Sequence, residues 1–315
     1  MLLDIDRISI TLLMDNYTDR LLPSSNVAKR PPMVKNGEIL PAPIAEHGFS
    51  ALVEIQRAEE KRRFLFDTGV SKEGIITNAG LFGVRLDVAA IILSHGHFDH
   101  FTGLVSTLAN IGVPTKLIVH PDAFLRRWLI FPDGSRAMMP YMDEEELKKL
   151  GAVIEKKSEA TPLPSKENPC LLVTGEIPRS TRYEIGFPLQ HAETRDGLMH
   201  DPMVRDDQAL VANVKGLGLV IISGCGHAGI INTINHARKL AGIKRVHAVV
   251  GGFHLTGPMY EGAIEPTLDA MGLVDPRYIV PCHCTGWKAV NRIAQLFPEK
   301  FIQPSVGTTL DFYTE

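Results

Sequence analysis

The sequence lacks the features that mark membrane, secreted and nucleic-acid-binding proteins. No stretch reaches the roughly 18 apolar residues that a membrane helix needs. The opening MLLDIDRISITLLMDN carries acidic residues where a signal peptide would be cationic and then apolar. The net charge is only −3, with no block of like charge, so non-specific nucleic-acid binding has no electrostatic support. We therefore expect neither nucleic acid nor membrane as a partner.

Cysteine is also scarce, since the 315 residues hold only Cys170, Cys225, Cys282 and Cys284. Two of them are separated by one residue, which is too close for an easy disulfide. A chain of this size with 44% hydrophobic residues can bury a full core without cross-links. We expect free thiols and a reducing, cytoplasmic location. Length alone fits either two domains of about 150 residues or one large domain.

Apolar patterning predicts strands that alternate with helices. Residues 88–94 (VAAIILS) are continuously apolar, which is typical of a strand buried on both faces, and helical spacing follows over 101–111. The last third repeats this pattern with a hairpin over 209–223, helices near 230–241, 262–271 and 286–297, and strands over 245–252 and 277–284. This alternation favours packed α/β layers.

Two segments break the regularity. Residues 19–46 hold five prolines and no periodicity, which predicts a long loop that serves as a lid, an arm or a flap. Residues 121–205 contain one predicted helix, 143–150, and one predicted strand, 170–177, in an otherwise loop-like region. We interpret the second segment as an insertion that shapes a substrate pocket.

The densest chemical motif is SHGHFDH, residues 94–100, where the apolar strand ends. His95, His97, Asp99 and His100 offer imidazole nitrogens and a carboxylate, ligands that suit zinc, iron or manganese. A helix cap would need only one such residue, and histidine is a poor choice for it. We predict that all four bind metal, and that two ions about 3.5–4 Å apart clamp a reactive oxygen.

Four ligands are too few for two metals, and three later strands end in further candidates. These are Cys225 and His227 in SGCGHAG, His254 in GGFHL, and His283 in PCHCTG. Ligand sites gather at one sheet edge in α/β layers. Any one of these histidines could be structural, but three in the same topological position favour a ligand role.

Together the motifs FLFDTG, SHGHFDH, IISGC and VPCH resemble, in this order, those of the metallo-β-lactamase superfamily. The resemblance covers nearly the whole chain. It implies an α/β fold of four layers, an αββα sandwich of two mixed sheets with helices outside, formed by residues 1–315 as one domain. We assign catalytic roles to Asp99, which would bind metal and orient the reactive oxygen, and to Asp67, which would fix a ligand histidine.

The sequence departs from the family at the third ligand of the first metal. Most of the superfamily has a histidine in a Gly-His-Thr turn before the fourth motif, where this chain reads MVRDDQ. The usual aspartate of the fourth motif is Cys225, whose thiolate would favour zinc, although a buried inert thiol is an equal alternative. We predict His227 as the third ligand, with Asp207 and His254 as alternatives and His47 as an additional candidate.

EHGFSALVE, TGEIPR, DDQALV, GGFHL and PCHCTGW are similar to the subgroup labelled 7,8-dihydropterin-6-ylmethyl-4-(β-D-ribofuranosyl)aminobenzene 5′-phosphate synthase-like. This implies an enzyme with two divalent ions, zinc foremost and iron or manganese as alternatives. Its substrate would be a phosphate- or diphosphate-bearing small molecule, such as a dihydropterin methyl diphosphate transferred to an aromatic amine. Helix starts at Gly229 and Gly286, and arginines in the insertion, are candidate phosphate-binding groups.

Two other functions stay open. The same metals could serve a hydrolase of a lactone, thioester or phosphodiester, or the chain could be a metal- or redox-sensing binding protein whose CHC element, residues 282–284, responds to oxidation. Retention of the whole His-x-His-x-Asp-His set argues against a metal-free relic. A homodimer is compatible with each function.

Overall fold

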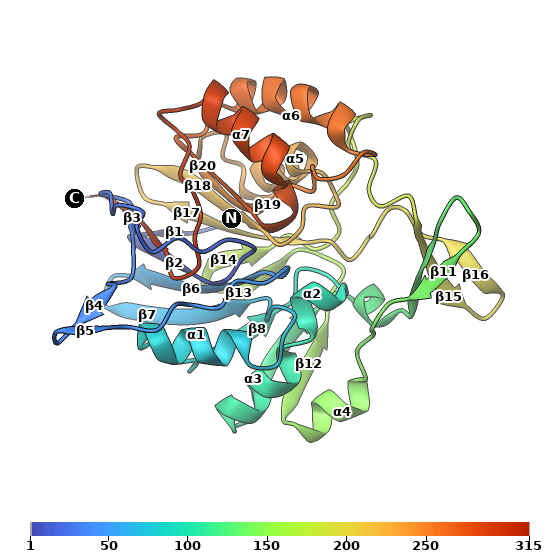
Figure 1. The fold of residues 1–315 in the computed structure, drawn as a ribbon, viewed down its shortest axis with the longest axis horizontal. Helices are drawn as coiled ribbons and strands as arrows, with labels where there is room; N and C mark the ends of the chain where they lie inside the picture. Colours follow the sequence, from blue (N-terminus) through green and yellow to red (C-terminus); the bar gives the residue numbers. More distant parts are fainter. Residues whose placement is uncertain (1, 315) are drawn as a thin grey trace.

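The computed structural model, which describes residues 2–314, has two large β-sheets packed face to face with helices on the outer face of each (Figure 1). These four layers confirm the predicted α/β class and αββα sandwich. One sheet is covered by α5 (Ile230–Ala241), α6 (Glu261–Val274) and α7 (Trp287–Leu296), the other by α1 (Gly74–Phe82), α3 (Leu104–Ile111) and the short α4 (Glu144–Lys149).

The first sheet has seven strands in the order β13-β14-β17-β18-β19-β20, with β1 also paired to β17. Its strands are β1 (Asp4–Ile5), β13 (Thr161–Pro164), β14 (Pro169–Val173), β17 (Ala209–Val214), β18 (Gly218–Ser223), β19 (Val246–Gly252) and β20 (Tyr278–Cys282). Strands β18, β19 and β20 are parallel, so their carboxyl ends lie at one edge.

The second sheet has eight strands in the order β12-β9-β8-β7-β6-β2-β21-β3. Its strands are β2 (Arg7–Met14), β3 (Ala28–Lys29), β6 (Ser50–Arg57), β7 (Glu60–Phe66), β8 (Ala90–Ile92), β9 (Thr115–Val119), β12 (Ala152–Lys156) and β21 (Thr309–Tyr313). Strands β7, β8, β9 and β12 are parallel.

The continuously apolar strands are apolar because both of their faces are buried. In β18, Val220 and Ile222 enter the core between the sheets, whereas Leu219 and Ile221 pack under the helices. The period-2 alternation of side chains thus places one apolar set in each of two cores.

The predicted helix over 101–111 is interrupted. It forms a single turn, α2 (Phe98–Phe101), and then α3, with Thr102 and Gly103 between them. Gly103 lies so close to the strand end that a Cβ there would be 2.1 Å from the Thr68 carbonyl oxygen. The predicted hairpin over 209–223 and the later helices and strands are confirmed, with shifts of a few residues at their ends.

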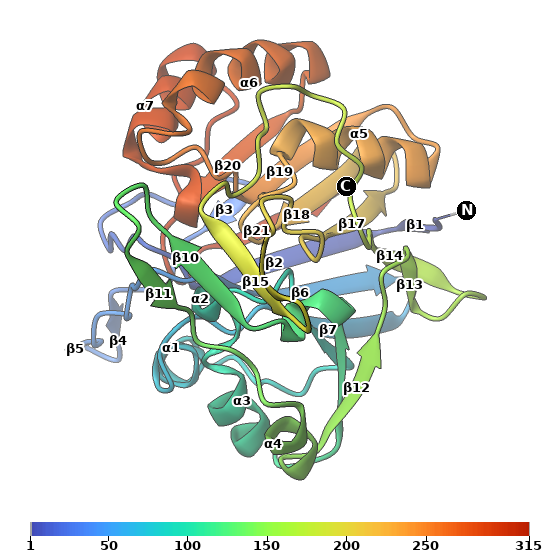
Figure 2. The ribbon, with the colours of Figure 1, turned by 90° about the vertical axis from the view of Figure 1, so that its right-hand side faces the viewer.

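The interpretation of residues 121–205 as a mostly loop-like insertion was wrong in part. The segment supplies β12 to one sheet and β13 and β14 to the other, because its short apolar runs pair with strands distant in sequence. It also forms a third, four-stranded sheet that lies beside the sandwich (Figure 2). The strands of this sheet are β11 (Arg136–Met138), β10 (Arg127–Ile130), β15 (Gln190–Thr194) and β16 (Gly197–His200).

The proline-rich segment 19–46 is a long loop, as predicted, apart from β3 and the hairpin of β4 (Val34–Lys35) and β5 (Glu38–Ile39). Within residues 2–314, none of the helices is both long and apolar enough to span a bilayer.

Gly251, near the end of β19, tests how closely the backbones of β18 and β19 pack at their carboxyl ends. Gly251 has a φ of +114°, and a Cβ there would lie 1.8 Å from the Ser223 carbonyl oxygen. We expect Gly251→Ala to lower the free energy of unfolding by about 3 kcal/mol or more. Gly262→Ala, with open space in α6, should raise it by up to about 1 kcal/mol. Urea unfolding followed by circular dichroism measures both, and equal values would contradict this packing.

Candidate metal centre

Five strand ends bring the candidate residues to one edge of the sandwich. Asp67 follows β7, the SHGHFDH segment follows β8, and the three later strands β18, β19 and β20 lead into the remaining candidates, namely Cys225, His227, His254 and His283. Because the carboxyl ends of parallel strands share an edge, residues far apart in the sequence become neighbours. Except for the exposed His47, all of the candidate side chains are buried or nearly so.

The first group of ligand atoms consists of three imidazoles. The rings of His95 and His97 are 4.5 Å apart between centroids, and His227 lies 4.8 Å and 4.6 Å from them. One nitrogen from each of the three lies within 4.8 Å of the others. The structure therefore brings His227 next to His95 and His97, the two histidines with which it was predicted to share a metal.

The second group is centred on the Asp99 carboxylate. Its Oδ2 lies 3.2 Å from His283 Nε2 and 3.7 Å from His100 Nε2. His47 Nε2 approaches the same oxygen at 3.7 Å from the exposed side. His95 and His100, whose ring centroids are 4.3 Å apart, bring the two groups side by side.

Cys225 lies between the two groups. Its Sγ belongs to one set of close ligand atoms with His95 and His100, and to another with His227 and His254. Its Sγ is also 2.9 Å from Sγ of Cys284, the last residue of the CHC element. By contrast, Cys282 points into the core between the sheets. The CHC element therefore does not act as one unit, and Cys225 and Cys284 form the neighbouring thiol pair.

Many histidine nitrogens at this edge are buried and have no hydrogen-bond partner among residues 2–314. They are Nε2 of His95, His100, His254 and His283, and both ring nitrogens of His227. A buried polar atom without a partner costs about 1–3 kcal/mol, so such a concentration calls for a ligand. Metal ions are the ligands that imidazole nitrogens, a carboxylate and thiols in this arrangement fit.

Hydrogen bonds select the nitrogen that each histidine turns toward the centre. Asp67 Oδ2 accepts from His100 Nδ1 at 2.7 Å, which leaves Nε2 of His100 facing inward. The same carboxylate accepts from the Ser94 backbone N–H at 2.6 Å and from Ser94 Oγ at 2.7 Å. Ser94 Oγ in turn lies 2.9 Å from His95 Nδ1. Asp67 thus orients two histidines, one of them through Ser94.

Two further orienting residues come from segments without a recognisable motif. Gln190 Oε1, in β15, accepts from His97 Nε2 at 2.5 Å and leaves Nδ1 toward the centre. Asn16 Oδ1 accepts from His283 Nδ1 at 3.0 Å, while Asn16 Nδ2 lies 3.0 Å from His47 Nδ1.

Asp207 is in none of the groups of close ligand atoms, and one of its two carboxylate oxygens is engaged elsewhere while Oδ1 is buried without a partner among residues 2–314. Asp207 Oδ2 accepts from the Ala228 N–H at 2.6 Å and so supports the turn that carries His227. Its neighbour Asp206 accepts from the Gly96 N–H at 2.7 Å and forms a buried ion pair with Arg127. The DD pair therefore supports both halves of the first histidine group.

Burial sets the protonation of four of these histidines, whereas the pKa of His100 is raised because the Asp67 and Asp99 carboxylates outweigh its burial. Burial lowers the pKa of His95 and His227 well below the ordinary value, and lowers the pKa of His97 and of His283 to about 4. These rings are therefore neutral near pH 7, and the neutral ring is the form that binds metal.

The expected phosphate site at the start of α5 is wrong. Glu184 Oε1 accepts from Ile231 N at 2.7 Å and Glu184 Oε2 from Asn232 N at 3.0 Å, so a carboxylate of the chain already caps this helix. Arg179, one of the arginines considered for phosphate, instead donates to the backbone carbonyls of His227 and Met203.

Comparison with known proteins agrees with this geometry. Residues 45–283 match the family model of the metallo-beta-lactamase superfamily. The chain is 35% identical over 263 residues to an uncharacterised protein of Methanocaldococcus jannaschii, covering 84% of this chain and 92% of that one. It is 31% identical over 275 residues, 85% and 90% of the two chains, to the 7,8-dihydropterin-6-methyl-4-(beta-D-ribofuranosyl)-aminobenzene-5′-phosphate synthase of the same organism.

A solved structure extends the agreement to the fold. The crystal structure of Tm1679, described as a metal-dependent hydrolase of the beta-lactamase superfamily, has a TM-score of 0.74 and 25% identity, and the match covers 98% of this chain and 100% of that one. The family model spans more than half of the chain, and both curated relatives exceed 30% identity over most of it. The chain belongs to the metallo-β-lactamase superfamily.

Proposed function

We propose that this protein is a dinuclear metal-dependent enzyme that acts on a phosphate- or diphosphate-bearing small molecule. The specific reaction that we put forward is displacement of diphosphate from a dihydropterin methyl group by an aromatic amine. The observation that carries the proposal is the three-histidine group and the adjoining group around Asp99, at the edge where the parallel strands end. Several of their histidine nitrogens are buried and have no hydrogen-bond partner among residues 2–314. The 31% identity to the synthase supports the choice of substrate.

In this proposal His95, His97 and His227 hold one ion, and Asp99, His100 and His283 hold the other, with Cys225 between them. Two divalent cations there would supply positive charge for a diphosphate leaving group, and the thiol favours zinc over harder ions. Asp67, Gln190 and Asn16 keep the ligand nitrogens in place by holding the opposite ring nitrogen.

The transfer balances without an external oxidant or reductant. The amine nitrogen bonds to the methylene carbon as the bond from that carbon to the diphosphate oxygen breaks, and the amine loses one proton. Asp99 and His47 lie where the cluster reaches the surface, since His47 is exposed and the two side chains are 3.7 Å apart. His47 would receive that proton, and Asp99, whose pKa is held well below its ordinary value by His100 and His283, would orient the reacting group.

A hydrolase of another bond is the second candidate. The structural similarity to a metal-dependent hydrolase favours it, and the same ligand groups would then activate water toward a lactone, thioester or phosphodiester. Glu184 occupies the α5 N-terminus, which removes one of the phosphate-binding groups that the sequence suggested.

Metal content tests the ligand assignment first. Protein purified without chelators, aerobically and anaerobically, should contain about two metal ions per chain by elemental mass spectrometry. His97→Ala should lose metal and activity with an unchanged circular dichroism spectrum, and His283→Ala should lose one ion preferentially. His191→Ala, in β15 and outside both groups, is the matched control. Unchanged metal content in His97→Ala would contradict the assignment of His97 as a metal ligand. Equal loss of both ions in His283→Ala would mean that the two sites are not separable.

A change at Asp67 tests the orienting role without removing a ligand. The backbone at Asp67 has a φ of 61°, which asparagine tolerates, so Asp67→Asn should keep the chain path. The amide cannot accept all of the hydrogen bonds that the carboxylate accepts, and we expect metal affinity to fall about 10–100-fold. Competition with a chelator measures this change, with the exposed Asp87→Asn as control. Equal affinities in the two variants would remove Asp67 from the proposed role.

The substrate itself is tested with the metal-loaded enzyme. Incubation with dihydropterin methyl diphosphate and an aromatic amine should give the coupled product and diphosphate in equal amounts by mass spectrometry, with His97→Ala as the inactive control. Diphosphate release without incorporation of the amine would indicate a hydrolase. No turnover of the pterin alongside cleavage of phosphodiesters would reject the transfer reaction and retain the metalloenzyme.

A further inference from the structure

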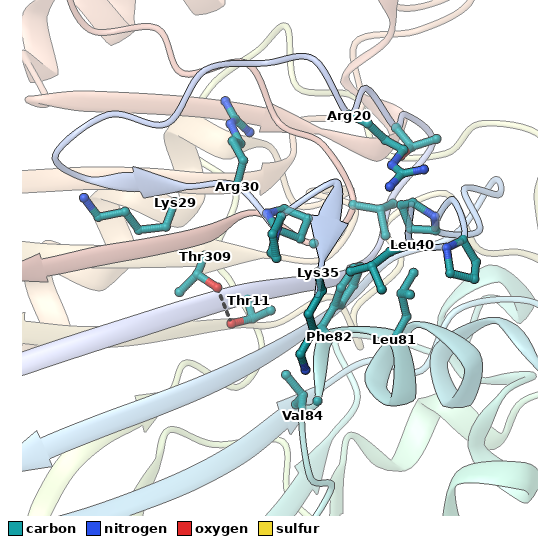
Figure 3. A pocket seen from close by; sticks show the side chains of 18 of the residues that line it. Thr11, Arg20, Lys29, Arg30, Lys35, Leu40, Leu81, Phe82, Val84 and Thr309 are labelled. Atoms are coloured by element: carbon teal, nitrogen blue, oxygen red, sulfur yellow. Dashed lines mark hydrogen bonds between the residues drawn. The ribbon is translucent and has the colours of Figure 1, made fainter. Parts of the chain in front are cut away.

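A cavity of about 440 Å³ lies away from the histidines, under the proline-rich segment 19–46 (Figure 3). Its volume falls within the range of small-molecule sites. The loop forms one side, the last residues of α1 with Gly83 and Val84 form another, and Thr11 of β2 and Thr309 of β21 lie between them. The two threonine hydroxyls are hydrogen-bonded to each other at 2.9 Å.

The cavity is lined by four cationic side chains in a chain whose net charge is −3. They are Arg20, Lys29, Arg30 and Lys35. Within residues 2–314, none of the four forms an ion pair with a carboxylate. The one acidic residue in the lining, Asp19, already accepts from the Leu21 N–H at 2.9 Å and from the Tyr17 hydroxyl at 3.1 Å.

Some hydrogen-bond donors of these four side chains hold the loop in place, whereas others have no partner among residues 2–314. Arg20 donates to the Met33 carbonyl and Lys29 to the Ser25 carbonyl, which leaves their charges uncompensated. Arg30 donates to Thr308 and Gln303, yet its Nε is buried without a partner in the described part of the chain, and burial lowers the pKa of Arg30. The Lys35 side chain makes no hydrogen bond or ion pair to residues 2–314 and extends toward Val84 in Figure 3.

The rest of the lining is apolar and stiff. Leu40, Leu81, Phe82 and Val84 provide apolar surface, and Pro31, Pro32, Pro41 and Pro43 restrict the loop that covers it. A ligand with a flat apolar group would bury that group here while its anionic end met the cations. Attraction to the negative carboxyl end of the α1 dipole does not explain Arg20, Lys29 and Arg30. Their hydrogen bonds go to the loop and to residues 303–308 rather than to the end of α1.

We propose that this cavity is a second binding site, separate from the histidine cluster, for a small anion such as a phosphate monoester that carries an apolar ring. Uncompensated cations beside apolar surface are the combination that recognises such a molecule. The inference does not depend on the reaction proposed above, since it rests on residues outside both ligand groups.

Isothermal titration of the metal-loaded protein with phenyl phosphate tests the proposal. We expect saturable binding of one molecule that weakens as salt is added, and no heat from phenol at the same concentrations. Lys35→Ala and Arg20→Ala should each weaken binding by about tenfold or more, because each removes a charged hydrogen-bond donor. Lys244→Ala, an exposed lysine after α5, is the matched control and should bind as the wild type does.

The variants also separate this cavity from the metal centre. Phenyl phosphate that binds at the metals would bind equally to Lys35→Ala, Arg20→Ala and the control, and that result would overturn the proposal. Absence of saturable binding to the wild-type protein would overturn it as well. Both substituted side chains lie at least partly in solvent, so equal melting temperatures should accompany the loss of affinity.

Discussion

The hydrogen bonds to the Asp67 carboxylate are the interaction on which the rest of the candidate centre depends. They join the ends of β7 and β8 through Ser94 and fix His100 directly. Asp67 holds a left-handed backbone, which costs about 1–3 kcal/mol and persists only where the surroundings enforce it. His254 and His283 share that conformation. Sheet pairing on both sides therefore sustains local strain that aims several side chains at one point.

A buried ion pair braces the first histidine group. Asp206, in the MVRDDQ segment, accepts from the Gly96 N–H and pairs with the buried Arg127 of β10. A buried ion pair adds little net stability, but loss of one partner is expensive, so such pairs fix geometry more than they stabilise. On the other side of this group, the ring of His227 is stacked against Phe187 of the insertion, with ring centroids 5.6 Å apart.

The fold and the gathering of the main candidate residues at one edge were predictable because their signals are local. A continuously apolar strand followed by His-x-His-x-Asp-His carries both its burial and its chemistry within a dozen residues. Gln190 escaped prediction, and so did the contact of Cys284 with Cys225, because these pairings span 93 and 59 residues, which no local period records. The prediction of a phosphate site at the α5 N-terminus was wrong for the same reason. The sequence reveals the glycine turn, but it does not reveal that the carboxylate of Glu184, 47 residues before Ile231, binds there.

Any selectivity for a substrate must come from residues other than the buried histidines, because these side chains are almost fully covered. His47 is the exposed member of the cluster, and it ends the segment that starts at Asn16. Both ends of this segment are held at the edge, Asn16 by His283 and Glu46 by the Val70 and Ser71 N–H groups. The exposed end of the histidine cluster therefore lies beside a loop whose ends are fixed and whose middle lines the cationic cavity. Variation in surface loops around an unchanged set of site residues is a general way in which one fold serves different reactions.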